Sequence, residues 1–302
     1  MDGRRRAIEW PTVLLIGGVY LVVGSLVYFH QSLPWWIITP VGACGVALYA
    51  SLQHEILHGH PTGNRIVNEA LILPTLHFWL PFGRYKETHL IHHNDANLTD
   101  PRHDPESYYL LPEAWANMPG VKRSLYRFNH TLFGRMLIGP AVSLLRFWPP
   151  EISDVVKGDR HKARAWAWFG VSAAISTWFI VVVAELALWK YLLFIAYPGV
   201  SLALVRSYCE HRAAADYRHR TIIVEASTFW SLLFLHNNLH VAHHSRPTLA
   251  WYKIPAYYRA ERERLIAEND GYLMPGYGEI FRRHLFHAKE PIPYPHMRWL
   301  KP

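Results

Sequence analysis

The sequence predicts an all-α integral membrane protein, with four transmembrane helices in two hairpins and a cytoplasmic helical cap that holds a metal site. Three observations predict this fold. Four apolar runs each come near the roughly 20 residues that a hydrocarbon layer about 30 Å thick requires. The Lys and Arg residues fall almost entirely on one side of these runs. The 20 histidines include three tight clusters on that same side.

The four predicted spans are poor in charge and closely paired. Connections of a few residues join the first span to the second and the third to the fourth, which makes two hairpins. Paired uncharged runs of this length are rare in soluble folds, and a cleaved signal peptide would be shorter than the first run. Two weaker apolar stretches, 66–82 and 131–147, are predicted as helices at the membrane surface or packed on the spans. The spans cover residues 12–29, 35–52, 165–184 and 188–205.

The composition supports this fold and excludes several others. Hydrophobic residues make up 51% and charged residues 18%, which excludes a disordered chain. Two cysteines cannot build a disulfide scaffold. The formal charge is +8, and the basic residues flank apolar runs of membrane length, so we expect lipid and not nucleic acid as the partner. We therefore expect one domain over residues 1–302, with the Pro-rich end Pro291-Ile-Pro-Tyr-Pro as an ordered or draped tail and not a linker to another domain.

The orientation follows from the basic residues. Thirty of the 31 Lys and Arg residues share one side of the predicted spans, and only Lys190 lies on the other. The positive-inside rule makes the basic side cytoplasmic. The first 11 residues, the segment 53–164 and the tail 206–302 are therefore expected in the cytoplasm, together with both termini.

Three clusters of histidine follow the spans on the predicted cytoplasmic side. Spacings of three and four residues place the imidazoles of a cluster on one helix face. Gathered imidazoles repel one another when protonated, and a metal ion removes that cost by binding them in the neutral form. The clusters therefore predict metal binding. Their members are His54 and His58, then His89, His92 and His93, and finally His240, His243 and His244.

The first cluster leaves a second interpretation open. His54-Glu55-Ile-Leu-His58 matches the H-E-x-x-H pattern of zinc proteases, in which Glu55 would be the general base. One zinc takes three protein ligands, which would leave the other clusters unexplained, so two metal ions fit better. A metal transporter would place its ligands at mid-membrane, whereas these clusters follow the spans. Imidazole suits Fe, Zn, Cu and Ni, so the ligands alone do not identify the metal.

Several further residues are candidates on weaker grounds. His211 stands alone after the fourth span, as His54 follows the second, so both are expected at one membrane depth. Glu55 and Glu210 could orient ligand imidazoles or could be ordinary interfacial carboxylates. His60 and His236 are expected to be structural or to support the ligands. Lone histidines such as His77 are interpreted as hydrogen-bonded core residues.

The ordered clusters resemble the histidine boxes of the membrane fatty acid desaturase superfamily. This superfamily includes acyl desaturases, alkane hydroxylases, and carotenoid ketolases and hydroxylases. The clusters match its H-x(3,4)-H, H-x(2,3)-H-H and H/Q-x(2,3)-H-H boxes, and the resemblance covers residues 35–258. His211 matches an extra histidine of the family, within a Tyr208-Cys-Glu-His211 element similar to that of alkane hydroxylases. The segment from Leu98-Thr-Asp-Pro to Asp104-Pro-Glu-Ser resembles bacterial desaturase-like proteins.

The resemblance implies a non-haem diiron enzyme that uses O2. Its two irons would be held by the eight clustered histidines and His211. Fatty acyl desaturation is the expected reaction, and hydroxylation or ketolation of a lipid, alkane or carotenoid is the alternative. A ferredoxin- or rubredoxin-like donor with its reductase would supply electrons, because the sequence lacks the His-Pro-Gly-Gly element of relatives fused to a haem domain. A bacterial member would lie in the plasma (inner) membrane. Ser207 departs from the Asn that some acyl-CoA desaturases carry there.

Overall fold

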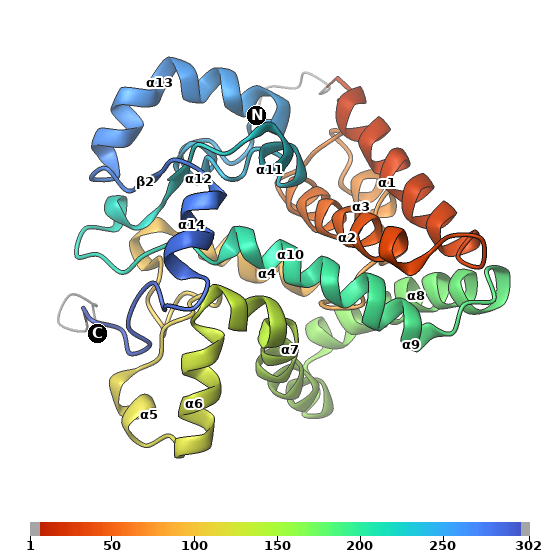
Figure 1. Cartoon of the computed structure of the whole chain (residues 1–302), viewed down its shortest axis with the longest axis horizontal. Helices are drawn as coiled ribbons and strands as arrows, with labels where there is room; N and C mark the ends of the chain where they lie inside the picture. Colours follow the sequence, from red (N-terminus) through yellow and green to blue (C-terminus); the bar gives the residue numbers. More distant parts are fainter. Residues whose placement is uncertain (1–6, 297–302) are drawn as a thin grey trace. The chain divides into compact units, whose positions relative to one another are not determined.

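The structure is a computed structural model that describes residues 7–296, and it is mostly helical (Figure 1). The chain forms two compact units, each built from two stretches of sequence. Arg4, Arg5 and Arg6, which contribute to the predicted orientation, lie outside the described residues. The first unit comprises Met1–Arg84 and Ala141–Ala203, and the second comprises Tyr85–Pro140 and Leu204–Pro302.

Four helical segments of the described residues are long and apolar enough to cross a membrane, which confirms the predicted number. Their length and composition indicate an integral membrane protein. The third and fourth segments each contain one π-helical stretch, η2 (Phe179–Val183) and η3 (Leu192–Ala196). The segments are α1 (Trp10–Tyr28), α2 (Trp35–Leu57), α8 with η2 (Arg160–Val183), and α9 (Leu188–Tyr191) with η3 and α10 (Tyr197–Ser207).

Two of the helices extend about one helical turn beyond the predicted spans. The second span was expected to end at residue 52, but α2 continues to Leu57 and carries His54 and Glu55 on its last turns. It ends there because Gly59 adopts a positive φ of 95°, the left-handed conformation that commonly ends a helix. The third was expected from residue 165, but α8 begins at Arg160, where the Asp159 carboxylate accepts hydrogen bonds from two backbone N–H groups.

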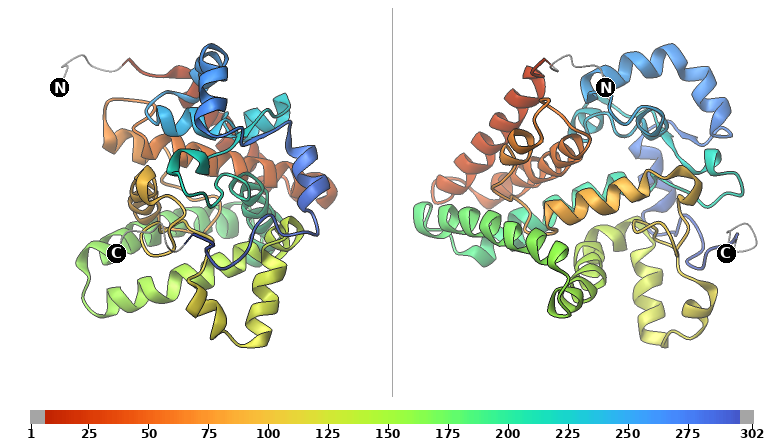
Figure 2. Two further views of the ribbon diagram at one scale, coloured as in Figure 1. Left: turned by 90° about the vertical axis from the view of Figure 1, so that its left-hand side faces the viewer. Right: turned by 180° about the vertical axis from the view of Figure 1, so that it is seen from behind.

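The helices of the first unit approach closely at small residues. α1 packs against α2, and α2 packs against η3, as the side-by-side helices in Figures 1 and 2 show for the first pair. A Cβ atom added at Gly199 would lie 2.4 Å from the Cβ of Val46, which is fully buried on α2. Small residues that let backbones approach are typical of helix packing in membranes.

Exposed aromatic side chains lie at the ends of the spanning helices. Tyr28 is the last residue of α1 and Phe29 is its C-cap, while Trp36 and Trp189 are the second residues of α2 and α9. All four lie beside the short connections of the two hairpins. Aromatic rings concentrate at membrane–water interfaces, so these residues mark one predicted face of the bilayer.

The connection between the second and third spans contains one long helix and several short ones. α7 (Leu132–Val156) confirms the helix expected over 131–147 and extends it. The helix expected over 66–82 is wrong, because only α3 (Arg65–Ala70) forms there before α4 (Phe82–His92) begins. Pro74 and Pro81 explain the difference, since proline and the residue before it both disfavour helix.

The second unit adds short helices and one pair of strands. β1 (Ile223–Val224) pairs in parallel with β2 (Leu273–Met274), which departs slightly from the all-α prediction. Its other elements include α5 (Pro112–Ala116), α6 (Gly120–Asn129), η4 (Tyr217–Arg220), α11 (Thr228–Leu233), α12 (His240–Ser245), η5 (Trp251–Lys253), α13 (Ile254–Glu268) and α14 (Tyr277–His284).

The Pro-rich tail is ordered as far as it is described. Leu110 donates a backbone hydrogen bond to the carbonyl of Ile292, and Tyr294 donates one to the carbonyl of Leu110. Ile292 and Tyr294 are buried. The Lys289 ammonium donates to the backbone carbonyl of His211, which ties the tail to a predicted ligand.

Candidate metal centre

Four predicted ligands converge within the second unit. His92 ends α4, His211 follows α10, and His240 and His244 lie one turn apart on α12. Their ligand nitrogens all lie within 4.8 Å of one another. The Nε2 atom of His211 lies 3.0 Å from Nε2 of His92 and 3.1 Å from Nε2 of His240. The structure thus brings together residues that lie more than 100 positions apart in the sequence.

In two of these rings, the nitrogen that faces away from the other histidines makes a hydrogen bond. Nδ1 of His92 lies 2.9 Å from the Asp104 carboxylate, which can only accept, so this nitrogen carries a hydrogen and donates it. Nδ1 of His240 lies 3.0 Å from the side-chain oxygen of Asn237 and donates in the same way. In the neutral ring, a hydrogen on Nδ1 leaves a lone pair on Nε2. When both rings are neutral, their Nε2 lone pairs therefore point toward His211.

The Nε2 atoms of these rings are better satisfied by a positive ion between them than by hydrogen bonds to one another. Nδ1 of His211 lies 3.3 Å from the Thr221 hydroxyl, and its Nε2 cannot donate one hydrogen fully to two neighbours. Burial lowers the pKa of His211 and His240 well below the usual range, so both rings are neutral. Nitrogens about 3 Å apart suit adjacent ligands of one ion with bonds of about 2.1 Å. The four residues therefore fit a metal ion.

The charge around His92 supports the same conclusion. Burial acts to lower the pKa of His92, but the carboxylates of Glu106 and Asp104 outweigh burial and raise it to about 9. The protein thus favours a positive charge at this ring. A metal ion is a positive charge that all four imidazoles can share while they remain neutral.

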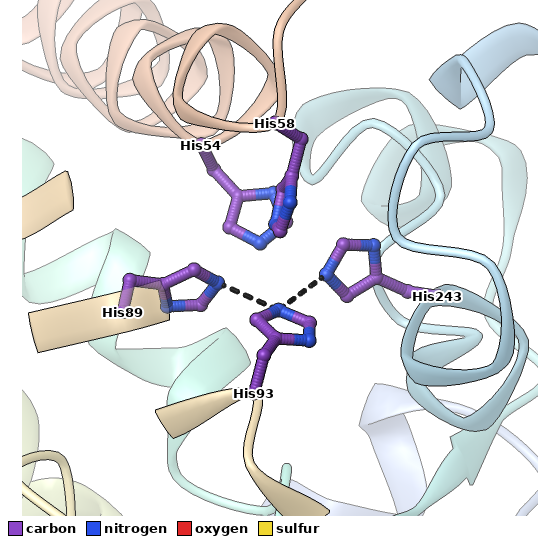
Figure 3. A group of neighbouring side chains, drawn as sticks. All are labelled: His54, His58, His89, His93 and His243. Atoms are coloured by element: carbon purple, nitrogen blue, oxygen red, sulfur yellow. Dashed lines mark hydrogen bonds between the residues drawn. The ribbon is translucent and has the colours of Figure 1, made fainter. Parts of the chain in front are cut away.

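Three further predicted ligands lie together in the second unit. Nε2 of His93 lies 3.0 Å from Nε2 of His89 and 3.1 Å from Nε2 of His243 (Figure 3). Nδ1 of His89 donates to the Glu106 carboxylate at 3.0 Å, and burial lowers the pKa of His89 well below its usual range. In this group, too, one ring has an outward Nδ1 that donates to a carboxylate while its Nε2 faces a neighbouring histidine.

The remaining two histidines of the boxes form a pair in the first unit. His54 and His58 lie one turn apart on α2 and its C-cap, and their ring centroids are 4.8 Å apart. Both side chains are buried, as is Glu55 between them. Figure 3 draws the pair with the three rings described above. The spacing of four residues therefore does place both imidazoles on one helix face, as predicted.

Three other histidines lie outside both groups, in structural contacts. His60 donates from Nδ1 to the Glu9 carboxylate at 2.8 Å, and His236 stacks on Trp251. His77 donates from Nε2 to the Gln53 side-chain oxygen at 2.7 Å. Burial lowers the pKa of His77 to about 3, so it is a neutral core residue as interpreted from the sequence.

Sequence reasoning missed most of the groups behind the ligands. In the sequence, Asp104 and Glu106 were noted only as part of a segment that resembles bacterial desaturase-like proteins. Carboxylates in a loop after a histidine box are nevertheless a recognisable signal for groups that orient metal ligands. Asn237 was also missed, and its position three residues before His240 could have indicated the contact. Glu210 is buried and receives a hydrogen bond from Asn237 at 3.4 Å. It therefore lies behind His240, with one carboxylate oxygen 3.7 Å from Nδ1 of that ring.

Comparison with known proteins agrees with this centre. The sequence profile described as "Fatty acid desaturase" matches residues 5–276, which is most of the chain. The chain belongs to the fatty acid desaturase family. No curated protein matches it. Members of the desaturase family are diiron oxidoreductases, so the chain is an enzyme of that class, and the predicted family is confirmed. The zinc-protease interpretation would leave the group of His92, His211, His240 and His244 without a role.

Proposed function

We propose that this desaturase family member uses two iron ions and O2 to introduce a double bond into a fatty acyl chain. The observation that carries the proposal is the convergence of inward Nε2 atoms in the second unit, on a chain of the desaturase family. Neutral imidazoles gathered in this way bind a divalent ion of the first transition series. The family supports iron as that ion.

The nine histidines divide into two ligand sets in this proposal. One ion is held by His92, His211, His240 and His244. The other is held by His89, His93 and His243, and we propose that the His54 and His58 pair completes this second set. Glu55 and Glu210 remain candidates for supporting roles behind the ligands.

The proposed reaction balances with an external reductant. Bound iron supplies the redox chemistry that activates O2 and removes hydrogen from an unactivated C–H bond. Loss of two hydrogens from adjacent carbons, with O2, two electrons and two protons, gives a double bond and two water molecules. A ferredoxin- or rubredoxin-like protein with its reductase would supply the electrons. Placement of the acyl chain relative to the site would decide between desaturation and hydroxylation.

Lipid analysis tests this reaction directly. Cells with and without the gene, grown with oxygen, are compared by mass spectrometry of their acyl chains, and a His240→Ala variant serves as the control. We expect acyl chains lighter by two hydrogen atoms only with the wild-type gene. Products heavier by one oxygen atom would instead assign the enzyme to the hydroxylases of the same scaffold. Lipid profiles that do not depend on the gene would contradict the proposal.

A further inference from the structure

We propose that the Asp104-Pro105-Glu106 loop is a clamp that fixes one metal-binding imidazole in each of the two histidine groups. The inference rests on the proposed function, because it assumes that both groups hold metal. It assigns positioning roles to two carboxylates that touch the ligands from behind. The loop lies in the second unit, as do the rings that it contacts.

Asp104 is the rigid half of the clamp. One carboxylate oxygen accepts from Nδ1 of His92 at 2.9 Å and from the backbone N–H of Glu106 at 2.9 Å. The other accepts from the backbone N–H of Thr99 at 2.8 Å. Its side chain is 2% exposed, and that of His92 is 3% exposed. The two backbone donors leave this carboxylate little freedom, so the His92 ring that it contacts is held with Nε2 facing His211.

Glu106 is the second half, and it reaches toward both groups. One carboxylate oxygen accepts from Nδ1 of His89 at 3.0 Å. The other oxygen lies 4.0 Å from Nε2 of His92, the nitrogen that faces His211 within the four-histidine group. The Glu106 side chain is 30% exposed, so its hold on His89 is looser than the hold of Asp104 on His92.

Asp104 contacts a histidine of one group and Glu106 contacts a histidine of the other, yet both carboxylates belong to one turn. The hydrogen bond from the Glu106 N–H to Asp104 fixes their separation. His89 and His92 are three residues apart on α4, so one loop can engage both rings at once. Carboxylates behind metal-binding imidazoles fix the tautomer and raise the basicity of the ligand nitrogen. They also place negative charge near ions that are bound by neutral ligands.

The chain offers a matched control for this clamp at Asp100. Its carboxylate accepts from the backbone N–H of Arg102 at 2.9 Å and from Nδ1 of His103 at 2.8 Å. Asp100 is buried like Asp104, but His103 is 46% exposed at its side chain and belongs to neither histidine group. Asp100→Asn therefore changes a carboxylate–imidazole turn without touching a ligand.

Metal release from the purified, iron-loaded protein in detergent tests the clamp. Wild type, Asp104→Asn, Glu106→Gln and Asp100→Asn are mixed with a chelator, and release is followed with the Mössbauer spectrum of the retained iron. We expect Asp104→Asn to release one iron about 10–100-fold faster, with a changed spectrum for that iron. Glu106→Gln should act more weakly and on the other iron. Asp100→Asn should match the wild type.

Unchanged release and an unchanged spectrum in Asp104→Asn would overturn the proposal. If Asp104→Asn does not fold, Glu106→Gln decides, because its more exposed side chain carries less of the fold; wild-type release and spectrum in Glu106→Gln would then reject the clamp. The wild-type metal content tests the proposed function separately. If the wild type holds zinc and no iron, that function fails, while the ratio of zinc release between variant and wild type still tests the clamp.

Discussion

At the scale of single residues, the inward nitrogen of three clustered histidines depends on what the outward nitrogen contacts. Asp104 accepts from His92, Glu106 accepts from His89, and the Asn237 side chain accepts from His240. Each contact places a hydrogen on Nδ1 and a lone pair on Nε2. These contacts therefore hold the three rings with Nε2 toward neighbouring histidines.

A pair of histidines near one another in sequence tests the assignment of ligands. His240→Ala removes an inward Nε2 from the four-histidine group, so we expect it to lower iron content and abolish turnover while the protein still inserts. His236→Ala should retain wild-type iron, because His236 stacks on Trp251 outside both groups. Iron is measured by elemental analysis of the purified variants. Wild-type iron and activity in His240→Ala would remove this residue from the ligand set.

The sequence was informative about ligands and silent about most of their partners. Spacings of four residues predicted pairs such as His240 and His244, which the structure places in one group. The prediction that a whole box shares one face is wrong, because His92 and His243 each join the other group from the rest of their box. The partner of His92 lies 12 residues away in a loop, and the hydroxyl near His211 lies 10 residues away. Loop contacts of this kind have no periodicity, so spacing could not predict them.

At the scale of helices, packing in the first unit depends on small residues. Gly199→Ala would place a methyl group 2.4 Å from the buried, β-branched Val46. We expect a loss of about 1–3 kcal/mol, because neither the Val46 side chain nor its helix can move freely. Gly170, on α8, has no neighbour within 4 Å of an added methyl group. Gly170→Ala is the control and should leave the melting temperature in detergent unchanged or slightly raised.

Equal melting temperatures for the two glycine variants would show that the close approach of α2 and the fourth span contributes nothing to stability.

A buried ion pair joins α4 to α7 within the first unit. The Arg84 guanidinium donates to both carboxylate oxygens of Glu151, at 2.7 and 2.9 Å, and Lys162 lies 3.0 Å from the same carboxylate. Glu151→Gln removes the negative charge that these cations face, so we expect a loss of about 3–5 kcal/mol. The exposed Glu113 offers a control, and Glu113→Gln should change stability by less than about 0.5 kcal/mol.

The same pair predicts a dependence on pH. Burial would raise the pKa of Glu151, but hydrogen bonds from Arg84 and Lys162 outweigh burial and lower it below its usual value of 4.5. A carboxyl group with a lowered folded-state pKa stabilises the protein fully above its unfolded pKa and loses that effect as the pH falls through the folded value. The melting temperature of the wild type should therefore fall more steeply below about pH 4.5 than that of Glu151→Gln. Parallel curves for the two proteins would contradict this assignment.

Apolar run length predicted the existence of the helices better than their ends. The number of spans is confirmed, but α2 extends past residue 52 because polar residues such as Gln53 and His54 continue the helix. The end at Gly59 depends on a backbone conformation that apolarity does not report. Over residues 66–82 the apolar run predicted a helix, but the prolines in this stretch interrupt it.

At the scale of the whole molecule, the distribution of basic residues predicts one topology. Because 30 of 31 Lys and Arg residues share a side of the spans, reporter fusions at both termini should read cytoplasmic. A fusion inserted after Glu185, in the short connection of the second hairpin, should read from the opposite side. A C-terminus on the far side of the membrane would contradict the four-span topology.

The central claim is that the histidine groups hold two irons, and metal counting of the purified chain tests it most directly. Protein expressed with adequate iron and zinc is purified in detergent, and its metals are measured against its protein concentration. We predict about two irons per chain, because two groups of inward imidazoles each suit one ion. One zinc per chain with no iron would contradict the diiron assignment and would support a zinc hydrolase that uses the His54-Glu55-x-x-His58 pattern.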